Sequence, residues 1–97
     1  MNPERMRDFD FACYFETAND GTILIKCRDL PQLLSWSADG QPEEVWARYA
    51  VEECIAFMLE KGLKVPFASA PLEGEYVVKL APELVTKIEK SNKALEE

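Results

Sequence analysis

The chain has 97 residues, 47% of them apolar and 10% aromatic, with 18 Asp and Glu against 11 Lys and Arg and a net charge of −7. This composition predicts one packed domain and excludes a disordered acidic tail. Because phosphate binding needs clustered Lys and Arg, the charge also excludes a broad nucleic-acid-binding surface.

The sequence contains no histidine, which excludes His-dependent nucleophilic sites and imidazole metal ligands. Its three cysteines, Cys13, Cys27 and Cys54, have no C-x-x-C spacing. We therefore expect buried apolar thiols, with no disulfide scaffold, metal or cofactor. No apolar run approaches the roughly 20 residues that cross a membrane, and the start lacks the apolar stretch of a signal peptide, so we expect a cytoplasmic protein.

The first part of the chain predicts a β-hairpin after a frayed polar start at residues 1–7. Residues 9–16 alternate, with three phenylalanines on one side, and residues 22–28 alternate again. The Ala-Asn-Asp-Gly sequence at 18–21 provides the turn, because Asn, Asp and Gly tolerate positive φ. Residues 33–37 then predict a short third strand that places Leu34 and Trp36 on one face.

A loop at 38–41 leads to a predicted helix of about 20 residues at 42–61, in which small and medium apolar residues recur at helical spacing. Pro42 suits its first turn and Gly62 its C-cap, while Trp46 is expected at the edge of the core. Residues 63–72 predict an irregular crossover, residues 76–80 a fourth strand, and Pro82 the start of a second helix that runs from about Glu83 to the end.

The order β-β-β-α-β-α predicts an α+β two-layer sandwich, with one long helix on the phenylalanine face of a four-stranded sheet. A right-handed crossover through that helix places the fourth strand in the same sheet. We expect a domain at 1–82 and a C-terminal helix at 83–97. The second sheet face, which carries Ala12, Tyr14, Leu24 and Lys26, with Leu33 as a further candidate, is expected to face water unless the last helix or another molecule covers it.

Five segments carry a resemblance to a known family, in this order: Phe11-Ala12-Cys13-Tyr14-Phe15-Glu16 with its Asp-Gly turn, Asp29-Leu30-Pro31, Glu43-Glu44-Val45, Glu60-Lys61-Gly62 followed by Val65-Pro66, and Val77-Val78-Lys79-Leu80-Ala81-Pro82 with Leu84-Val85-Thr86-Lys87-Ile88. In this order and spacing, the chain resembles the HicB family of antitoxins over nearly its whole length.

The resemblance implies a partial RNase H-like fold without catalysis. The implied partner is a basic HicA-type toxin, which resembles double-stranded-RNA-binding domains and cleaves messenger RNA, and the antitoxin would occlude its active site or RNA-binding surface. Longer members continue into a segment that binds operator DNA. We expect DNA binding only through such a segment, which is absent from these 97 residues.

The residues themselves leave several interface candidates open. Candidate toxin contacts are Tyr14, Glu16, Lys26, Asp29 and Trp36, although the preferred role of Asp29 is to cap the strand and position the turn. Pairing of a second copy along the fourth strand would use Val77, Val78, Leu80, Leu84 and Ile88.

Two other functions remain as alternatives. One is an oligomerisation and regulatory domain of a transcriptional repressor. The other is a metal-dependent nuclease that uses Asp10, Glu44, Glu52 and Glu53, although we expect these carboxylates to point apart.

Overall fold

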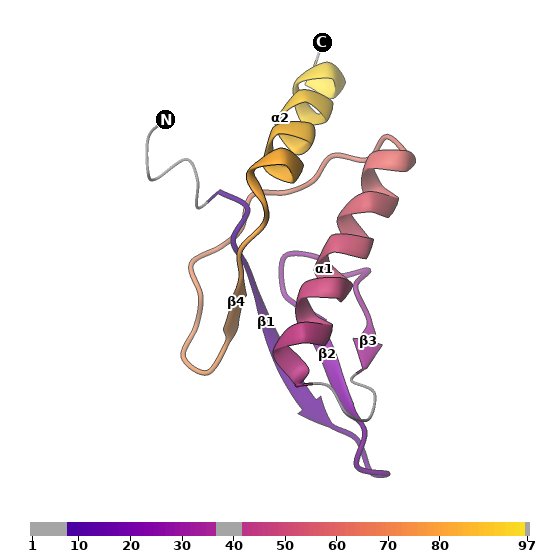
Figure 1. Cartoon of the computed structure of the whole chain (residues 1–97), viewed down its shortest axis with the longest axis vertical. Coiled ribbons are helices and arrows are strands. Elements are labelled where there is room, and N and C mark those ends of the chain that lie inside the picture. Colours follow the sequence, from indigo (N-terminus) through magenta and orange to yellow (C-terminus); the bar gives the residue numbers. More distant parts are fainter. Residues whose placement is uncertain (1–7, 37–41, 97) are drawn as a thin grey trace.

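A computed structural model describes residues 8–36 and 42–96. Its elements are β1 (Phe11–Thr17), β2 (Ile23–Cys27), β3 (Ser35–Trp36), α1 (Glu43–Glu60), β4 (Tyr76–Val78) and α2 (Pro82–Glu96). The predicted α+β fold, with a four-stranded antiparallel sheet and two helices, is confirmed (Figure 1). Four predicted features lie outside the described residues: the frayed start, the end of the third strand at Ser37, the loop at 38–41 and the last residue, Glu97.

The predicted hairpin is present, with Cys13 opposite Cys27 and Thr17 opposite Ile23. Gly21 has a φ of +89°, which glycine adopts without strain. The Asp20 carboxylate accepts a 2.9 Å hydrogen bond from the Thr22 amide, which holds the turn and lowers the pKa of that carboxyl. Turn chemistry that is local in sequence therefore sets the β1–β2 register.

The sheet order is β3-β2-β1-β4, and every neighbouring pair is antiparallel. The strand β4 therefore runs opposite to β3 at the far edge of the sheet. The prediction of a shared sheet is confirmed, but the right-handed rule applies to parallel crossovers and does not govern this connection. Both edge strands are shorter than predicted, with two residues in β3 and three in β4.

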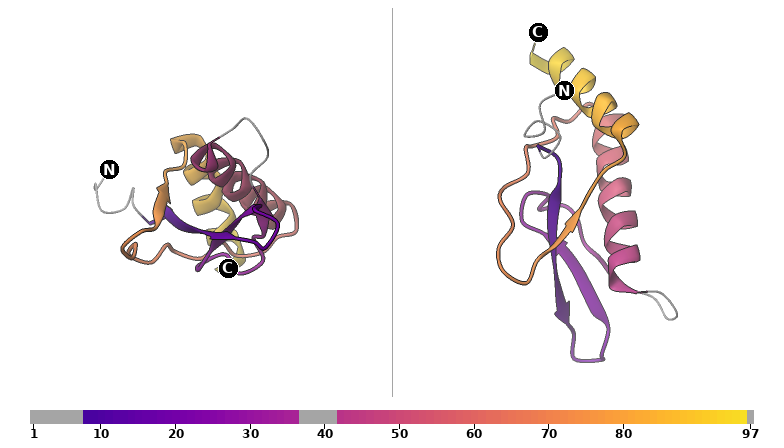
Figure 2. Two further views of the ribbon diagram at one scale, coloured as in Figure 1. Left: turned by 90° about the horizontal axis from the view of Figure 1, so that it is seen from below. Right: turned by 60° about the vertical axis from the view of Figure 1, so that its left-hand side comes forward.

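The core lies between α1 and the phenylalanine face of the sheet, as predicted. Phe9, Phe11 and Cys13 are buried, and Phe15 packs at the margin of the core. The helix contributes mainly small and medium side chains, which let it lie close to the strands: Ala47, Ala50, Val51, Ile55 and Met58. Figure 2 shows α1 lying along this one face of the sheet.

The helix α1 ends in a Schellman motif at Gly62, which has a φ of +70°. The Leu63 amide donates to the Met58 carbonyl at 2.8 Å, and the Gly62 amide donates to the Leu59 carbonyl at 3.3 Å. This cap turns the chain into the long connection at residues 61–75, which crosses to the other side of the sheet (Figure 2).

The helix α2 lies beyond the end of the sheet and does not cover its second face (Figure 1). Ile88 is fully buried in the core. Asn92 is also buried, and its side-chain amide makes two hydrogen bonds with the main chain of Val65, at 3.0 and 2.8 Å. The second helix is therefore docked on the connection rather than on the strands.

Candidate protein-binding surface

Four of the five predicted toxin contacts lie together on the sheet face opposite α1. The register places Tyr14 opposite Lys26 and Glu16 opposite Leu24, and β3 adds Trp36 opposite Leu24. Since side chains alternate across a strand, Tyr14, Glu16, Leu24, Lys26 and Trp36 share the face that points away from the core. We call these five residues the open sheet face.

Trp36 is the most prominent member of the open sheet face, with 59% of its surface exposed. Leu24 lies opposite it on β2 and is half-buried, and Tyr14 is half-buried on β1, opposite Lys26. An exposed tryptophan next to a leucine forms an apolar centre of the kind that dominates binding energy in protein interfaces.

Glu16 and Lys26 form an ion pair within this face, on the two rungs of the β1–β2 ladder that they share with Leu24 and Tyr14, and Lys26 Nζ lies 2.8 Å from Glu16 Oε2. The hydrogen bond to Glu16 raises the pKa of the Lys26 ammonium. Both side chains are solvent-exposed, so the pair contributes little to stability. It instead holds two opposite charges in fixed positions next to the aromatic centre.

The fifth predicted contact, Asp29, lies apart from the other four. Its carboxylate accepts hydrogen bonds from the Ser69 amide at 2.8 Å and the Ser69 hydroxyl at 2.6 Å. Asp29 therefore fastens the connection at 61–75 to the end of β2, in agreement with the structural alternative. Its contact with a toxin remains a prediction.

The same connection covers the other end of the second sheet face. Ala12, which was expected to face water, is buried. Arg28 donates to both carboxylate oxygens of Glu75, at 2.9 and 2.7 Å, and to the Ala70 carbonyl at 3.1 Å. The connection therefore limits the open sheet face to the hairpin and β3. The proline-rich sequence of the connection did not indicate that it would pack against the sheet.

The predicted dimer contacts divide into two groups. Val78 and Ile88 fill this chain's own core, so their side chains are not available to a second copy. Leu80 and Leu84 are half-buried against that core, and Val77 is half-buried on the second sheet face. Tyr76, which the sequence did not single out, is the exposed apolar residue of β4.

The thiols lie in or beside the core, and the described carboxylates form no metal site. Cys13 and Cys27 are buried opposite each other, as expected, and Cys54 is half-buried. A hydrogen bond to Cys27 and burial raise the pKa of the Cys13 thiol. Within residues 8–36 and 42–96, no three His, Cys, Asp or Glu side chains are grouped so that they could hold a metal ion.

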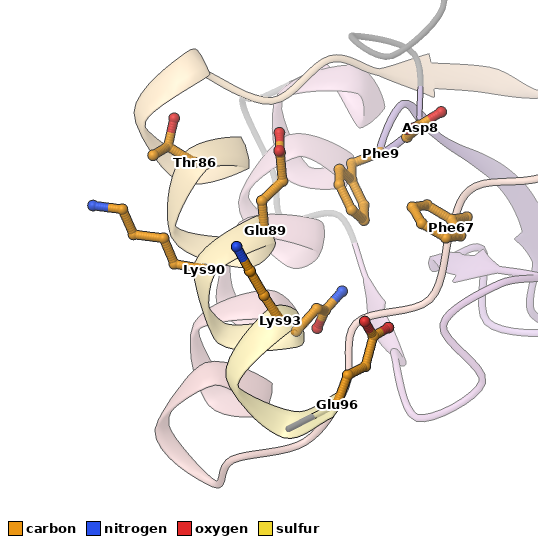
Figure 3. A pocket seen from close by; sticks show the side chains of 9 residues that line it. Asp8, Phe9, Phe67, Thr86, Glu89, Lys90, Lys93 and Glu96 are labelled. Atoms are coloured by element: carbon orange, nitrogen blue, oxygen red, sulfur yellow. The ribbon is translucent and has the colours of Figure 1, made fainter.

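A hollow of about 490 Å³ lies between the start of β1 and α2, away from the open sheet face. Phe9 and Phe67 stack at 5.5 Å on one wall, and Glu89 and Lys93 extend from α2 (Figure 3). Its lining contains both carboxylates and ammonium groups. Its lining residues are Asp8, Phe9, Phe67, Thr86, Glu89, Lys90, Asn92, Lys93 and Glu96.

Comparison with known proteins places the chain in a family. Neither α1 nor α2 is long and apolar enough to cross a membrane. A search of curated proteins found no match. The family model HicB-like_2, described as the HicB_like antitoxin of a bacterial toxin-antitoxin system, matches residues 11–89, a segment that contains all four strands, α1 and the first part of α2. The chain belongs to this family of non-enzymatic, HicB-like antitoxins.

Proposed function

We propose that this antitoxin neutralises its cognate toxin by direct binding through the open sheet face. The proposed partner is a small basic HicA-type ribonuclease that cleaves messenger RNA, and the bound antitoxin covers its active site or RNA-binding surface. The observation that carries this proposal is Trp36, an exposed tryptophan opposite Leu24 on the sheet face that Tyr14 shares and that α1, α2 and the connection leave uncovered.

The charge of the chain supports a basic partner. The net charge is −7, so a toxin with an RNA-binding surface is attracted at long range before the two molecules touch. A negatively charged protein surface also competes with RNA phosphates for the same basic groups. The apolar centre at Trp36 then supplies short-range binding energy, and the surrounding charges set the orientation.

An RNA-cleavage assay with the cognate toxin tests the proposal. Excess wild-type chain is expected to abolish cleavage and to co-elute with the toxin in size-exclusion chromatography. Trp36→Ala is expected to weaken binding by about 30-fold or more, the cost of truncating an interface hot spot. The matched control is Leu72→Ala, because Leu72 is 60% exposed and lies on the connection. Undiminished cleavage at excess wild-type antitoxin would refute the proposal.

A second candidate function, an oligomerisation and regulatory domain of a repressor, is favoured by the position of β4. This strand is at the edge of the described sheet and carries the exposed Tyr76. Main-chain pairing of two β4 strands would give a homodimer whose DNA-binding segment lies outside these 97 residues. Light scattering on the chain alone and gel-shift assays on a longer product distinguish the two candidates: a dimer that never binds the toxin supports the second.

A further inference from the structure

The outward side of α1 combines negative charge with exposed aromatic rings. Its 18 residues include five glutamates and one arginine, which give it a net charge of −4. Tyr49, Glu53, Phe57 and Glu60 follow one another at spacings of four, four and three residues, so they lie on one side of the helix. We call these four residues the α1 stripe. All four are exposed, Phe57 to 49%.

A groove of about 410 Å³ runs between the α1 stripe and the segment that leads into β3. Its walls combine the apolar residues Leu33, Leu34, Ala50, Cys54 and Phe57 with the polar residues Gln32, Ser35 and Glu53, and Glu53 is the charged residue among them. Leu34 is 63% exposed, which is unusual for a leucine beside a core. Within the described residues, Glu53 has neither an ion pair nor a hydrogen bond.

The strand β3 forms one edge of the described sheet, and it pairs only with β2. Its outer main-chain groups are free to pair with another extended chain, which is how many peptides add to a sheet edge. In such an added strand, alternate side chains point to the same side, so those on the α1 side would reach the groove.

We propose that an extended segment of the bound toxin adds to the outer edge of β3, with an apolar side chain in the groove and a Lys or Arg at Glu53. This inference rests on the proposed function and names a second contact for the same partner. Leu34, which the sequence placed on the same face as Trp36, precedes β3 and lines the groove instead. The open sheet face and the groove therefore lie on the two sides of the β3 edge. In this proposal the toxin contacts both sides of the β3 edge.

Charge favours the toxin over a second copy of this chain as the occupant. Two α1 helices that met across the groove would bring net charges of −4 together, which is unfavourable. The helix α2 carries three glutamates and three lysines and is electrically neutral, so it has no complementary charge to offer. The ring of Phe57 already has a cation near it, with Lys61 Nζ 5.9 Å from its centroid.

Substitutions in the groove test the proposal by isothermal titration of the wild-type toxin into the antitoxin. Phe57→Glu and Leu34→Glu are each expected to raise the dissociation constant by at least about tenfold. The matched control Leu72→Glu adds the same charge at a similarly exposed leucine and is expected to stay within about twofold. Thermal unfolding of each variant checks the fold, and exposed positions are expected to tolerate the change.

Amide hydrogen exchange supplies a readout specific to strand addition. The amides of residues 34–36 are expected to exchange at least about tenfold more slowly in the complex. Wild-type affinity in both groove variants, or unchanged exchange at 34–36, would overturn the proposal. So would a homodimer of the chain alone that Phe57→Glu dissociates, because that result assigns the groove to a second copy.

The design separates this inference from the proposed function. If Trp36→Ala weakens binding while the two groove variants bind normally, only the groove contact is wrong. If the reverse holds, the groove contact stands and the open sheet face is not the main contact. If the wild-type chain does not bind the toxin, both proposals are wrong.

Discussion

Glu75 is the single side chain that ties the turn before β4 to the sheet. Its carboxylate accepts two hydrogen bonds from Arg28 and a third, at 2.7 Å, from the Leu72 amide. The hydrogen bonds from Arg28, followed by that from Leu72, lower the pKa of Glu75 from 4.5 to about 2. Folding therefore favours the ionised form of the Glu75 carboxylate.

Glu75→Gln is expected to remove a pH-dependent part of the stability. Because the folded-state pKa is depressed, the contribution of Glu75 is present above the unfolded pKa of 4.5 and is lost as the pH falls toward about 2. Urea unfolding of both proteins across this range measures it. The difference in unfolding free energy should be largest near neutral pH and shrink on acidification. A difference that is the same at both ends of the range would contradict this assignment.

Trp46 carries a polar atom that its surroundings do not use. Its indole packs against the core and lies edge-on to Tyr49 at 6.2 Å, but its buried Nε1 has no hydrogen-bond partner among the described residues. The predicted position at the edge of the core is therefore confirmed. An unsatisfied buried donor costs about 1–3 kcal/mol, and this cost cancels part of the stabilisation that packing of the Trp46 ring provides.

Trp46→Phe is expected to change the unfolding free energy by less than about 1 kcal/mol, because it removes the unsatisfied donor together with some apolar contact. Chemical denaturation measures the change. Ile55→Ala, which empties a fully buried site on the same helix, is the reference and should cost about 2–5 kcal/mol. A loss of more than about 2 kcal/mol in Trp46→Phe would mean that Nε1 is hydrogen-bonded in solution.

A buried polar side chain helps to attach α2 to the connection. Asn92 Oδ1 accepts from the Val65 amide and Asn92 Nδ2 donates to the Val65 carbonyl, in a site where Val65 is itself buried. Buried peptide groups must be hydrogen-bonded, and here a side chain replaces the neighbouring strand that would otherwise pair with them. Asn92 is thus a structural element of the connection as much as of α2.

Asn92→Ala is expected to destabilise the protein by about 2–4 kcal/mol, since it leaves two buried groups of Val65 unpaired. Lys93→Ala, one residue further along the same helix and exposed, is the control and should change stability by less than about 0.5 kcal/mol. Hydrogen exchange at the Val65 amide gives a local readout. If that amide remains protected in Asn92→Ala, α2 is held by its apolar contacts alone.

The elements that the sequence predicted well are those with local signals. The alternating phenylalanines, the Asp-Gly turn and the helical spacing after Pro42 depend on neighbouring residues, and β1, β2 and α1 follow them closely. The connection at 61–75 is held by contacts distant in sequence, such as Asp29 with Ser69. No periodicity records such contacts, which is why Ala12 was expected to face water.

The same distinction applies to the candidate site at the scale of the whole molecule. Strand alternation placed Tyr14, Glu16 and Lys26 on one face. It did not assign Trp36 to that face, and Leu33, which was a candidate for it, lies in the core. It could not show that Val78 and Ile88 complete the core, because an apolar side chain looks the same in a core and in an interface. Nor could it show the groove beside β3, which exists only once α1 lies across the sheet.

The uneven distribution of charge leads to a prediction about association rates. The net charge of α1 is −4 and that of α2 is zero, so a basic toxin should be steered toward the α1 side of the molecule. The Debye length is about 10 Å at 0.1 M salt, so added salt screens this steering. In stopped-flow measurements, the association rate constant is expected to fall by about tenfold or more between low and high salt.

Paired substitutions test whether the charge on α1 is responsible. The double variant Glu53→Gln with Glu60→Gln should slow association at low salt more than the double variant Glu73→Gln with Glu83→Gln, which removes the same charge outside α1. Equal slowing by the two pairs would show that only net charge matters, and rates independent of salt would exclude steering altogether.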